Sequence, residues 1–119
     1  AQAVACSFCQ EFGIDENEMF RIAEGFGLGM GVMEMCGALS GMAMIIGLSN
    51  SRGNTEEGSG SKGDTYKKLR TYIQKFKEKN GSCICRELKG VETGKVLCSC
   101  PQCITDAVAL TEEYLAENR

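Results

Sequence analysis

The sequence of 119 residues contains no histidine, no tryptophan and a single proline. Without an imidazole, the chain cannot form a Cys-His or Ser-His nucleophile pair. The same absence excludes zinc sites with histidine ligands and haem attachment through a C-x-x-C-H motif. Any metal would therefore have to be bound by thiolate, carboxylate or backbone oxygen, and thiolates select iron–sulfur clusters, zinc or Cu(I).

Cysteine, by contrast, is abundant, with eight residues in the chain. A chain of this length can bury a modest core, so the thiols are not needed merely to hold a miniature scaffold together. No secretory signal pattern opens the sequence, and we expect a reducing, cytoplasmic setting. In such a setting, metal binding or redox chemistry is favoured over four stable disulfides.

The net charge of −3 is unevenly distributed along the chain. Residues 1–50 carry six acidic side chains and one basic one, whereas residues 62–90 carry nine basic and three acidic ones. The overall acidity, with no aromatic residues regularly interleaved among the bases, argues against nucleic-acid binding. The lysine-rich segment 64–80 is either a solvated helix face or a docking patch for an acidic redox partner protein.

Apolar residues recur at helical spacing along most of the chain, which predicts an all-α fold. We expect one redox-type domain over residues 1–119, built as a compact bundle of about five mostly antiparallel helices around a central apolar helix at residues 36–49. A short helical turn should precede Gly90, and the Gly- and Ser-rich residues 49–63 should form a flexible internal connector. The outer helices are expected within residues 1–13, 14–26, 64–81 and 99–118.

Asp15 and Asp64 are predicted to cap the helices that follow them, and Gly13 and Gly81 to end helices. The buried face of each outer helix should be formed by apolar residues three or four positions apart. These stripes are Val4, Phe8 and Phe12; Met19, Ile22, Ala23 and Phe26; Tyr66, Leu69, Ile73 and Phe76; and Ile104, Val108, Thr111 and Leu115.

The apolar middle of the chain raises the question of a membrane span, because residues 25–48 hold only one charge, Glu34. The uninterrupted apolar part after Ser40 is far shorter than the ~20 residues that a span needs, so we expect none. Gly37 and Gly41, four residues apart, would let another helix or a cofactor approach closely. A buried helix with a glycine face would also suit a homodimer.

The run "GFGLGMG" before this helix places glycine at alternate positions. It is not a dinucleotide fingerprint, because G-x-G-x-x-G needs a third glycine three positions after the second. The run is either a loop that passes close to another part of the chain, or a ring of N–H groups that faces an anion or an anionic cluster. The candidate cofactor-binding glycines are Gly27, Gly29, Gly31, Gly37 and Gly41.

Cys36, Cys85 and Cys103 all fall at the starts of predicted helices. A helix N-terminus offers free N–H donors and about half a positive charge, which should favour thiolate and lower the thiol pKa. Thiolate is the form needed for redox attack and for metal ligation. These three cysteines are therefore candidate redox and metal-binding residues, the alternative being three small buried apolar side chains.

The remaining cysteine motifs are less specific. Cys6 and Cys9 form a C-x-x-C in the middle of a predicted helix, unlike a thioredoxin site, which starts a helix after a strand. Cys98, Cys100 and Cys103 form a C-x-C-P-x-x-C, which could supply half of a zinc or iron–sulfur site.

Taken together, these motifs resemble the redox-active C_GCAxxG_C_C family over nearly the whole chain. The family's Cys-Gly-Ala-x-x-Gly motif corresponds to residues 36–41, and the glycine run before it is also similar. The segment "GSCICREL" resembles the family's Gly-x-x-x-Cys-Arg-Glu-Leu and carries Cys85. The segment "CITDAVALTEEYL" resembles the start of its last helix and carries Cys103.

The resemblance implies a redox role for four cysteines, and related domains fused to electron-transfer modules suggest an iron–sulfur centre. In such proteins the first cysteine stands just before a stretch like "AQAV", with which this sequence begins. Either a cysteine upstream of Ala1 or Cys6 would then take the first place. The other four cysteines lie outside the family pattern: Cys9, Cys83, Cys98 and Cys100.

Three functions are consistent with the sequence. The first is an electron-transfer protein whose iron–sulfur cluster, or zinc as the second choice, is bound by Cys36, Cys85, Cys103 and Cys6. The second is a metal-free thiol–disulfide protein in which Cys36 reacts with Cys85 or Cys103. The third is a non-enzymatic structural or metal-sequestering helical protein. Convergence of the three helix-start cysteines would support a shared site, whereas their scattering through the core would weaken both redox functions.

Overall fold

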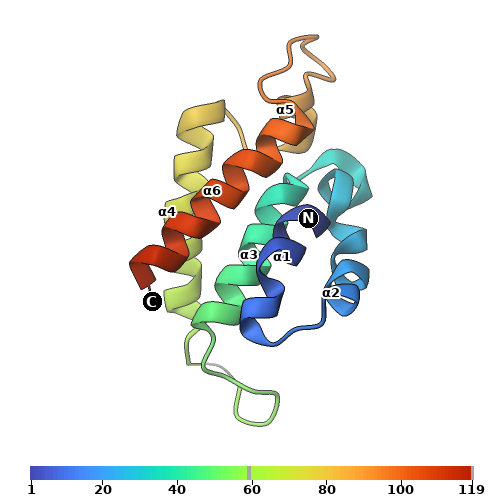
Figure 1. Ribbon diagram of the computed structural model, residues 1–119. Helices are drawn as coiled ribbons and strands as arrows, with labels where there is room; N and C mark the ends of the chain where they lie inside the picture. Colours follow the sequence, from blue (N-terminus) through green and yellow to red (C-terminus); the bar gives the residue numbers. More distant parts are fainter. Residues whose placement is uncertain (59, 119) are drawn as a thin grey trace.

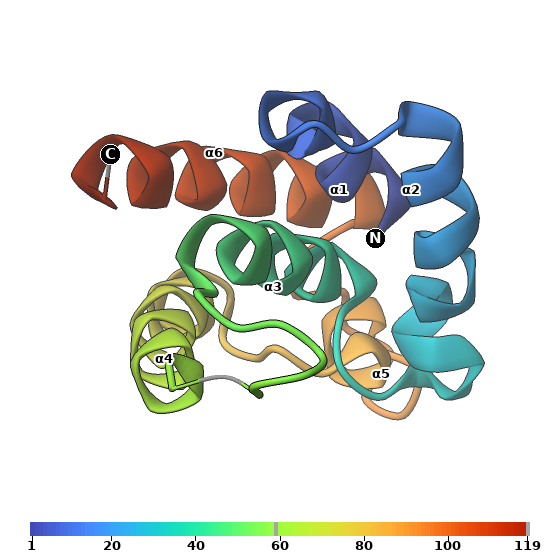
Figure 2. The same cartoon turned by 90° about the horizontal axis from the view of Figure 1, so that it is seen from below.

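The apolar segment predicted at residues 36–49 forms helix α3 (Gly37–Asn50), which runs through the middle of the computed structural model (Figure 1). α3 is apolar nearly all round, and it is covered by other helices on several sides. α1 (Gln2–Phe8) and α6 (Cys100–Asn118) lie on one side of it and α4 (Lys62–Asn80) on another (Figure 2). Six of its residues are buried: Ala38, Leu39, Gly41, Met42, Ile45 and Ile46.

The structure describes residues 1–58 and 60–118, which form six α-helices and no β-strand. The two helices not yet named are α2 (Glu16–Ala23) and the short α5 (Cys85–Lys89). Single turns of tighter helix extend α1 over Cys9–Phe12 and α2 over Glu24–Phe26. The predicted all-α bundle around a central apolar helix is therefore confirmed.

Most of the predicted helix ends are confirmed. The Asp15 carboxylate accepts a hydrogen bond from the Glu18 N–H at 3.0 Å, and Gly13 and Gly81 take left-handed backbone conformations at helix ends. Asp64 is not a cap, because α4 begins two residues earlier. Its carboxylate instead accepts a hydrogen bond from Asn50, the last residue of α3.

The predicted core stripes are largely buried, with two clear errors. Ile22 is 59% exposed and Tyr66 is 54% exposed. Met19 and Ala23 define the buried face of α2, and Ile22 lies about 100° around the helix from Ala23. Tyr72 and Phe76 define the buried face of α4, and Tyr66 likewise lies about 100° around the helix from that face. Tyr72 packs edge-on against Tyr114, a core residue that the predicted stripe omitted.

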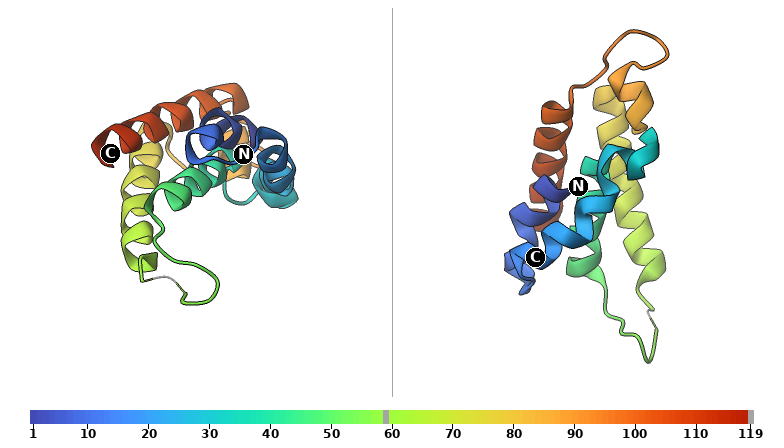
Figure 3. Two further views of the ribbon diagram at one scale, coloured as in Figure 1. Left: turned by 60° about the horizontal axis from the view of Figure 1, so that its bottom comes forward. Right: turned by 90° about the vertical axis from the view of Figure 1, so that its right-hand side faces the viewer.

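The segment between α3 and α4 and the segment between α5 and α6 project from opposite ends of the molecule (Figure 3). The molecule is accordingly elongated, with extents of 47, 28 and 24 Å. Ser59, part of the connector predicted at residues 49–63, lies outside the described residues. None of the helices in the described part of the chain is long and apolar enough to cross a membrane, as expected.

A buried carboxylate joins the end of α4 to α6. Asp106 is 5% exposed, and it accepts hydrogen bonds from Lys79 at 2.6 Å, Gln102 at 2.8 Å and Asn80 at 3.2 Å. Burial by itself would raise the pKa of Asp106, but these hydrogen bonds outweigh that effect and hold the pKa below its ordinary value. The network therefore stabilises the folded state while the carboxylate is ionised.

We expect Asp106→Ala to lower the free energy of unfolding by about 2 kcal/mol at pH 7, because hydrogen bonds to charged groups are worth ~1.5–3 kcal/mol. The unfolded carboxyl titrates near pH ~3.9 and the folded one below it, so this contribution is complete above that pH. It is lost as the pH falls through the folded pKa, and the two proteins should then converge in stability. Urea denaturation across pH 3–7 measures this.

The matched control is Glu112→Ala, at an exposed position of the same helix. It should change the free energy of unfolding by less than about 0.5 kcal/mol. Equal losses from the two substitutions would contradict a specific role for the Asp106 network.

Gly41 lies where α1 packs on α3. A Cβ atom there would be 2.6 Å from the Ala1 carbonyl oxygen and 2.9 Å from the Val4 Cβ. Of the two roles predicted for this glycine, close approach of another helix is the one the structure supports. The close neighbour belongs to the same chain, so Gly41 is not available to a second copy.

We expect Gly41→Ala to lower the free energy of unfolding by about 1–2 kcal/mol, because the overpacking cost exceeds the gain in helix propensity. Gly47→Ala is the matched control on the same helix, since nothing lies within 4 Å of its Cβ position. That control should raise the free energy of unfolding by up to about 1 kcal/mol. Thermal unfolding measures whether each substitution lowers or raises the stability. Stabilisation by both substitutions would rule out the tight contact at Gly41.

Candidate redox site

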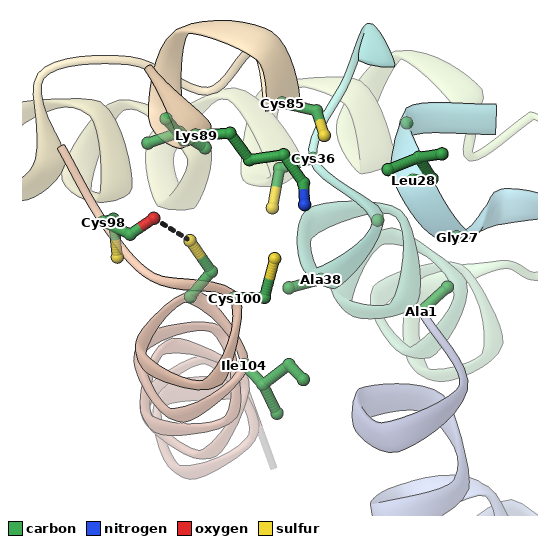
Figure 4. Close-up of a pocket in the computed structure, with 14 residues that line it drawn as sticks. Ala1, Gly27, Leu28, Cys36, Ala38, Cys85, Lys89, Cys98, Cys100 and Ile104 are labelled. Carbon is green, nitrogen blue, oxygen red and sulfur yellow. Dashed lines mark hydrogen bonds between the residues drawn. The ribbon is translucent and has the colours of Figure 1, made fainter. Parts of the chain in front are cut away.

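One end of the bundle holds a pocket whose lining is rich in thiols (Figure 4). The first turns of α3 and α6 meet α5 there, around a cavity of about 190 Å³. Apart from Lys89, the other lining residues are small or apolar, among them Ala38, Leu88 and Ile104. Five of the eight cysteines line the cavity: Cys36, Cys85, Cys98, Cys100 and Cys103.

Backbone pairing brings the first two of these cysteines together. Met35 and Ile84 form an isolated antiparallel bridge, although they are far apart in the sequence. The Cys36 N–H donates to the Cys83 carbonyl at 2.9 Å, and the Cys85 N–H donates to the Glu34 carbonyl. Because Cys36 and Cys85 directly follow the paired residues, α3 and α5 both begin at the pocket.

The backbone of α5 also holds the third cysteine-bearing segment. The Leu88 carbonyl accepts hydrogen bonds from the N–H groups of Leu97 at 3.0 Å and Cys98 at 3.2 Å. Ser99 then caps α6, accepting the Gln102 N–H on its hydroxyl at 3.3 Å. These contacts place the first turn of α6 against α5.

Cys103 lies in this first turn and is buried. Its S–H donates to the Cys98 carbonyl at 3.8 Å, the contact drawn as a dashed line in Figure 4. Cys36, Cys85 and Cys103 therefore come to one pocket from three separate segments, each at the start of a helix.

The glycine run forms one wall of this pocket with an unusual backbone. Four consecutive residues, Leu28 to Gly31, have φ values of 52°, 57°, 61° and 76°, and thus form a left-handed turn. Gly29 is obligatory in it, because a Cβ atom there would be 2.5 Å from the Glu34 nitrogen. Arg86 of α5 holds the end of the run by donating to the Val32 carbonyl at 3.0 Å and pairing with Glu34 at 3.2 Å.

The five candidate glycines separate into two groups. Gly27, Gly29 and Gly37 line the pocket, whereas Gly31 and Gly41 do not. Gly37 also sits in a crowded place, since a Cβ atom there would be 2.9 Å from the Phe26 carbonyl oxygen. The run thus passes close to its own chain, which is the first alternative raised by the sequence, and it also borders the pocket.

Cys6 is not among the pocket residues. It lies on α1, lines a separate shallow depression with Glu16 and Phe20, and directs its S–H at the Glu16 carbonyl at 3.8 Å. Cys9 is fully buried beside it. The structure therefore does not bring Cys6 to the three cysteines with which it was grouped.

Cys98 and Cys100 line the pocket, although the sequence analysis did not select them as site residues. The signal that could have found them is the C-x-C-P-x-x-C spacing to Cys103, which keeps three thiols within one helix start and the residues before it. The family pattern does not contain these two cysteines, so the resemblance gave no reason to assign them to the site.

Two of the pocket thiols, those of Cys85 and Cys103, have raised pKa values. Burial raises the pKa of Cys85, and the charge of Lys89 opposes that rise. Burial also raises the pKa of Cys103, and the adjacent thiols of Cys98 and Cys36 raise it further. The predicted lowering at helix N-termini is therefore wrong for Cys85 and Cys103. An apolar pocket penalises the thiolate, and a five-residue α5 has only a small dipole to oppose this.

None of the eight cysteines is in a disulfide. Among the described residues, no three cysteine, aspartate or glutamate side chains are grouped closely enough to hold a single metal ion. The thiols therefore surround the cavity without forming a ready-made site for one ion.

Comparison with known proteins gives one match. The family model described as "Putative redox-active protein (C_GCAxxG_C_C)" matches residues 1–114. No curated protein and no solved structure matches the chain.

The left-handed turn generates a stability prediction at Met30, which is 62% exposed with φ of 61°. Met30→Gly should raise the free energy of unfolding by about 1 kcal/mol, because a left-handed conformation costs a residue with a Cβ atom ~1–2 kcal/mol. Val32→Gly is the control, since Val32 is similarly exposed and has no positive φ. Val32→Gly should lower the free energy of unfolding by up to about 1 kcal/mol. Urea titration of both variants measures the two changes. Destabilisation by both would mean that the turn is not left-handed.

Proposed function

The chain belongs to the redox-active protein family defined by the C_GCAxxG_C_C pattern, and we propose that it transfers electrons through an iron–sulfur cluster bound in the cysteine pocket. One observation carries the proposal: Cys36, Cys85 and Cys103, on three separate segments, line the same cavity. A stable core alone would not require so many thiols to face one space.

The donor set fits such a cluster. The pocket offers thiols but no carboxylate and no imidazole, and soft thiolate ligands select iron–sulfur clusters, zinc or Cu(I). The thiols are spread around the cavity rather than grouped for one ion. When bound, such a cluster supplies one-electron oxidation and reduction.

Other residues are better candidates than Cys6 for the fourth ligand. Cys98 and Cys100 already line the pocket. Ala1 lines it too, so in a longer chain the residue before Ala1 would start at the same cavity. That position agrees with the first cysteine of the family pattern, which stands just before the "AQAV" stretch.

The protein's own part in this function is to bind the cluster and to set the charge and polarity around it. α3 and α6 direct their N-termini at the cavity, where free N–H groups and the helix dipole favour negative charge. Leu88 and Ile104 give the pocket apolar walls, and the polarity around a cluster influences its reduction potential.

The lysine-rich helix predicted as a partner surface has fewer unpaired charges than its sequence suggests. Lys68, Lys75 and Lys79 form ion pairs with acidic residues of the same chain. A redox partner that docks on α4 would therefore use the other exposed bases, chiefly Lys67, Arg70 and Lys77.

A second candidate function is thiol–disulfide exchange without metal. It is favoured by the position of Cys103, whose thiol lies next to those of Cys36 and Cys98. Closing one such pair would release two electrons and two protons to a disulfide partner, which would be reduced to two thiols. The burial of these thiols is a disadvantage for this reaction, since the attacking species is the thiolate.

Anaerobic reconstitution with iron and sulfide tests the first proposal. We expect visible absorption and stoichiometric iron and sulfide in the wild-type protein. Each single substitution of a proposed ligand should lower the amount of bound cluster by roughly tenfold or more: Cys36→Ser, Cys85→Ser and Cys103→Ser. The reason is that even the loss of an outer-shell partner costs about 10–100-fold in metal affinity. Cys6→Ser is the matched control and should retain the wild-type amount.

A wild-type protein that stays colourless and iron-free after reconstitution would overturn the cluster proposal. Mass spectrometry of alkylated, unreduced protein would then examine the second candidate. A disulfide joining Cys103 to Cys36 or Cys98 after mild oxidation would support it, and free alkylation of all eight thiols would rule it out.

A further inference from the structure

Lys89 is the one charged side chain among the described residues that line the pocket. It is the last residue of α5 and is half-buried. In Figure 4 its side chain extends over the cavity in the direction of Cys36 and ends with its nitrogen among the thiols. Neither the family motif nor the cysteine spacing drew attention to this residue.

No ion pair within the described part of the chain involves Lys89. The charged groups near it on α5 are already engaged. Arg86 pairs with Glu34, and the Glu87 carboxylate accepts a hydrogen bond from Ser82. No carboxylate lines the pocket, so the side chains that surround the ammonium group there are thiols and apolar groups.

An ammonium group in such a place pays a desolvation cost that an adjacent anion would offset. A lysine that served only as a solvated surface residue would gain more by turning away from the apolar wall. The thiols become anionic when they bind a metal centre, because coordination removes their protons. Four thiolates around an iron–sulfur cluster give a site of net negative charge.

We propose that Lys89 binds the anionic centre of this pocket by balancing its negative charge, and that it thereby raises the reduction potential of that centre. The proposal rests on the cluster function proposed above and adds a residue from outside the ligand set. Reduction adds one electron from an external donor, here dithionite, and makes the centre more negative. A cation beside it favours the reduced form, so its removal should lower the potential.

The experiment compares Lys89→Gln with Lys89→Arg in the anaerobically reconstituted full chain. Lys62→Gln at the start of α4 is the matched control, because it makes the same charge change at an exposed position outside the pocket. Dithionite titrations followed by visible absorption give the midpoint potential of each protein. Iron retained at increasing chelator concentration gives a second readout that does not depend on electron transfer.

We expect Lys89→Gln to have a lower midpoint potential than the wild type and to lose its iron at a roughly tenfold lower chelator concentration. Lys89→Arg keeps the charge and should stay close to the wild type, as should Lys62→Gln. Far-UV circular dichroism and thermal unfolding should show that all three variants remain folded.

Two different failures can be told apart. If the wild type binds a cluster and Lys89→Gln matches Lys62→Gln in both readouts, the role of Lys89 is overturned and the cluster function stands. If the wild type binds no cluster, the cluster function fails, and the role of Lys89 fails with it. If Lys89→Arg loses iron as readily as Lys89→Gln does, that result would also contradict a role of Lys89 through its charge.

Discussion

Backbone hydrogen bonds to α5 hold the cysteine pocket together. The Met35–Ile84 bridge fixes the start of α3 against the start of α5, and the Leu88 carbonyl fixes the chain that leads into α6. These contacts use main-chain groups, which every residue but proline carries in full, so they leave the side chains of the same segments free to line the cavity. A helix of five residues can thus organise three segments because it lies between them.

Burial and charge act in opposite directions in this pocket. The apolar walls disfavour thiolate, which raises the pKa values of Cys85 and Cys103. Lys89 and the N-termini of α3 and α6 favour negative charge in the same space. This balance disfavours the free thiolates of Cys85 and Cys103, but the same space would favour negative charge once a metal centre replaced their protons. This is the behaviour expected of a ligand set rather than of an exposed nucleophile.

The pocket also contains the least regular backbone of the fold. Leu28 and Met30 adopt left-handed conformations that are costly for residues with a Cβ atom. The Arg86 contacts to Val32 and Glu34 help to hold that turn in place. Elsewhere the helices are joined by well-satisfied contacts such as the Asp106 network. Backbone strain of this kind is concentrated at functional sites in other proteins, and the rest of the structure compensates for it.

The sequence by itself determined the helices, the central position of 36–49 and the placing of three cysteines at helix starts, because hydrophobic period and helix ends depend on near neighbours. It misjudged Ile22, Tyr66, Asp64 and the direction of the thiol pKa shifts, each of which depends on what packs against the residue. Only the tertiary structure decided that Cys98, Cys100 and Lys89 share the cavity while Cys6 does not. The physical reason is that pairing between distant segments, such as Met35 with Ile84, leaves no local signature in either one.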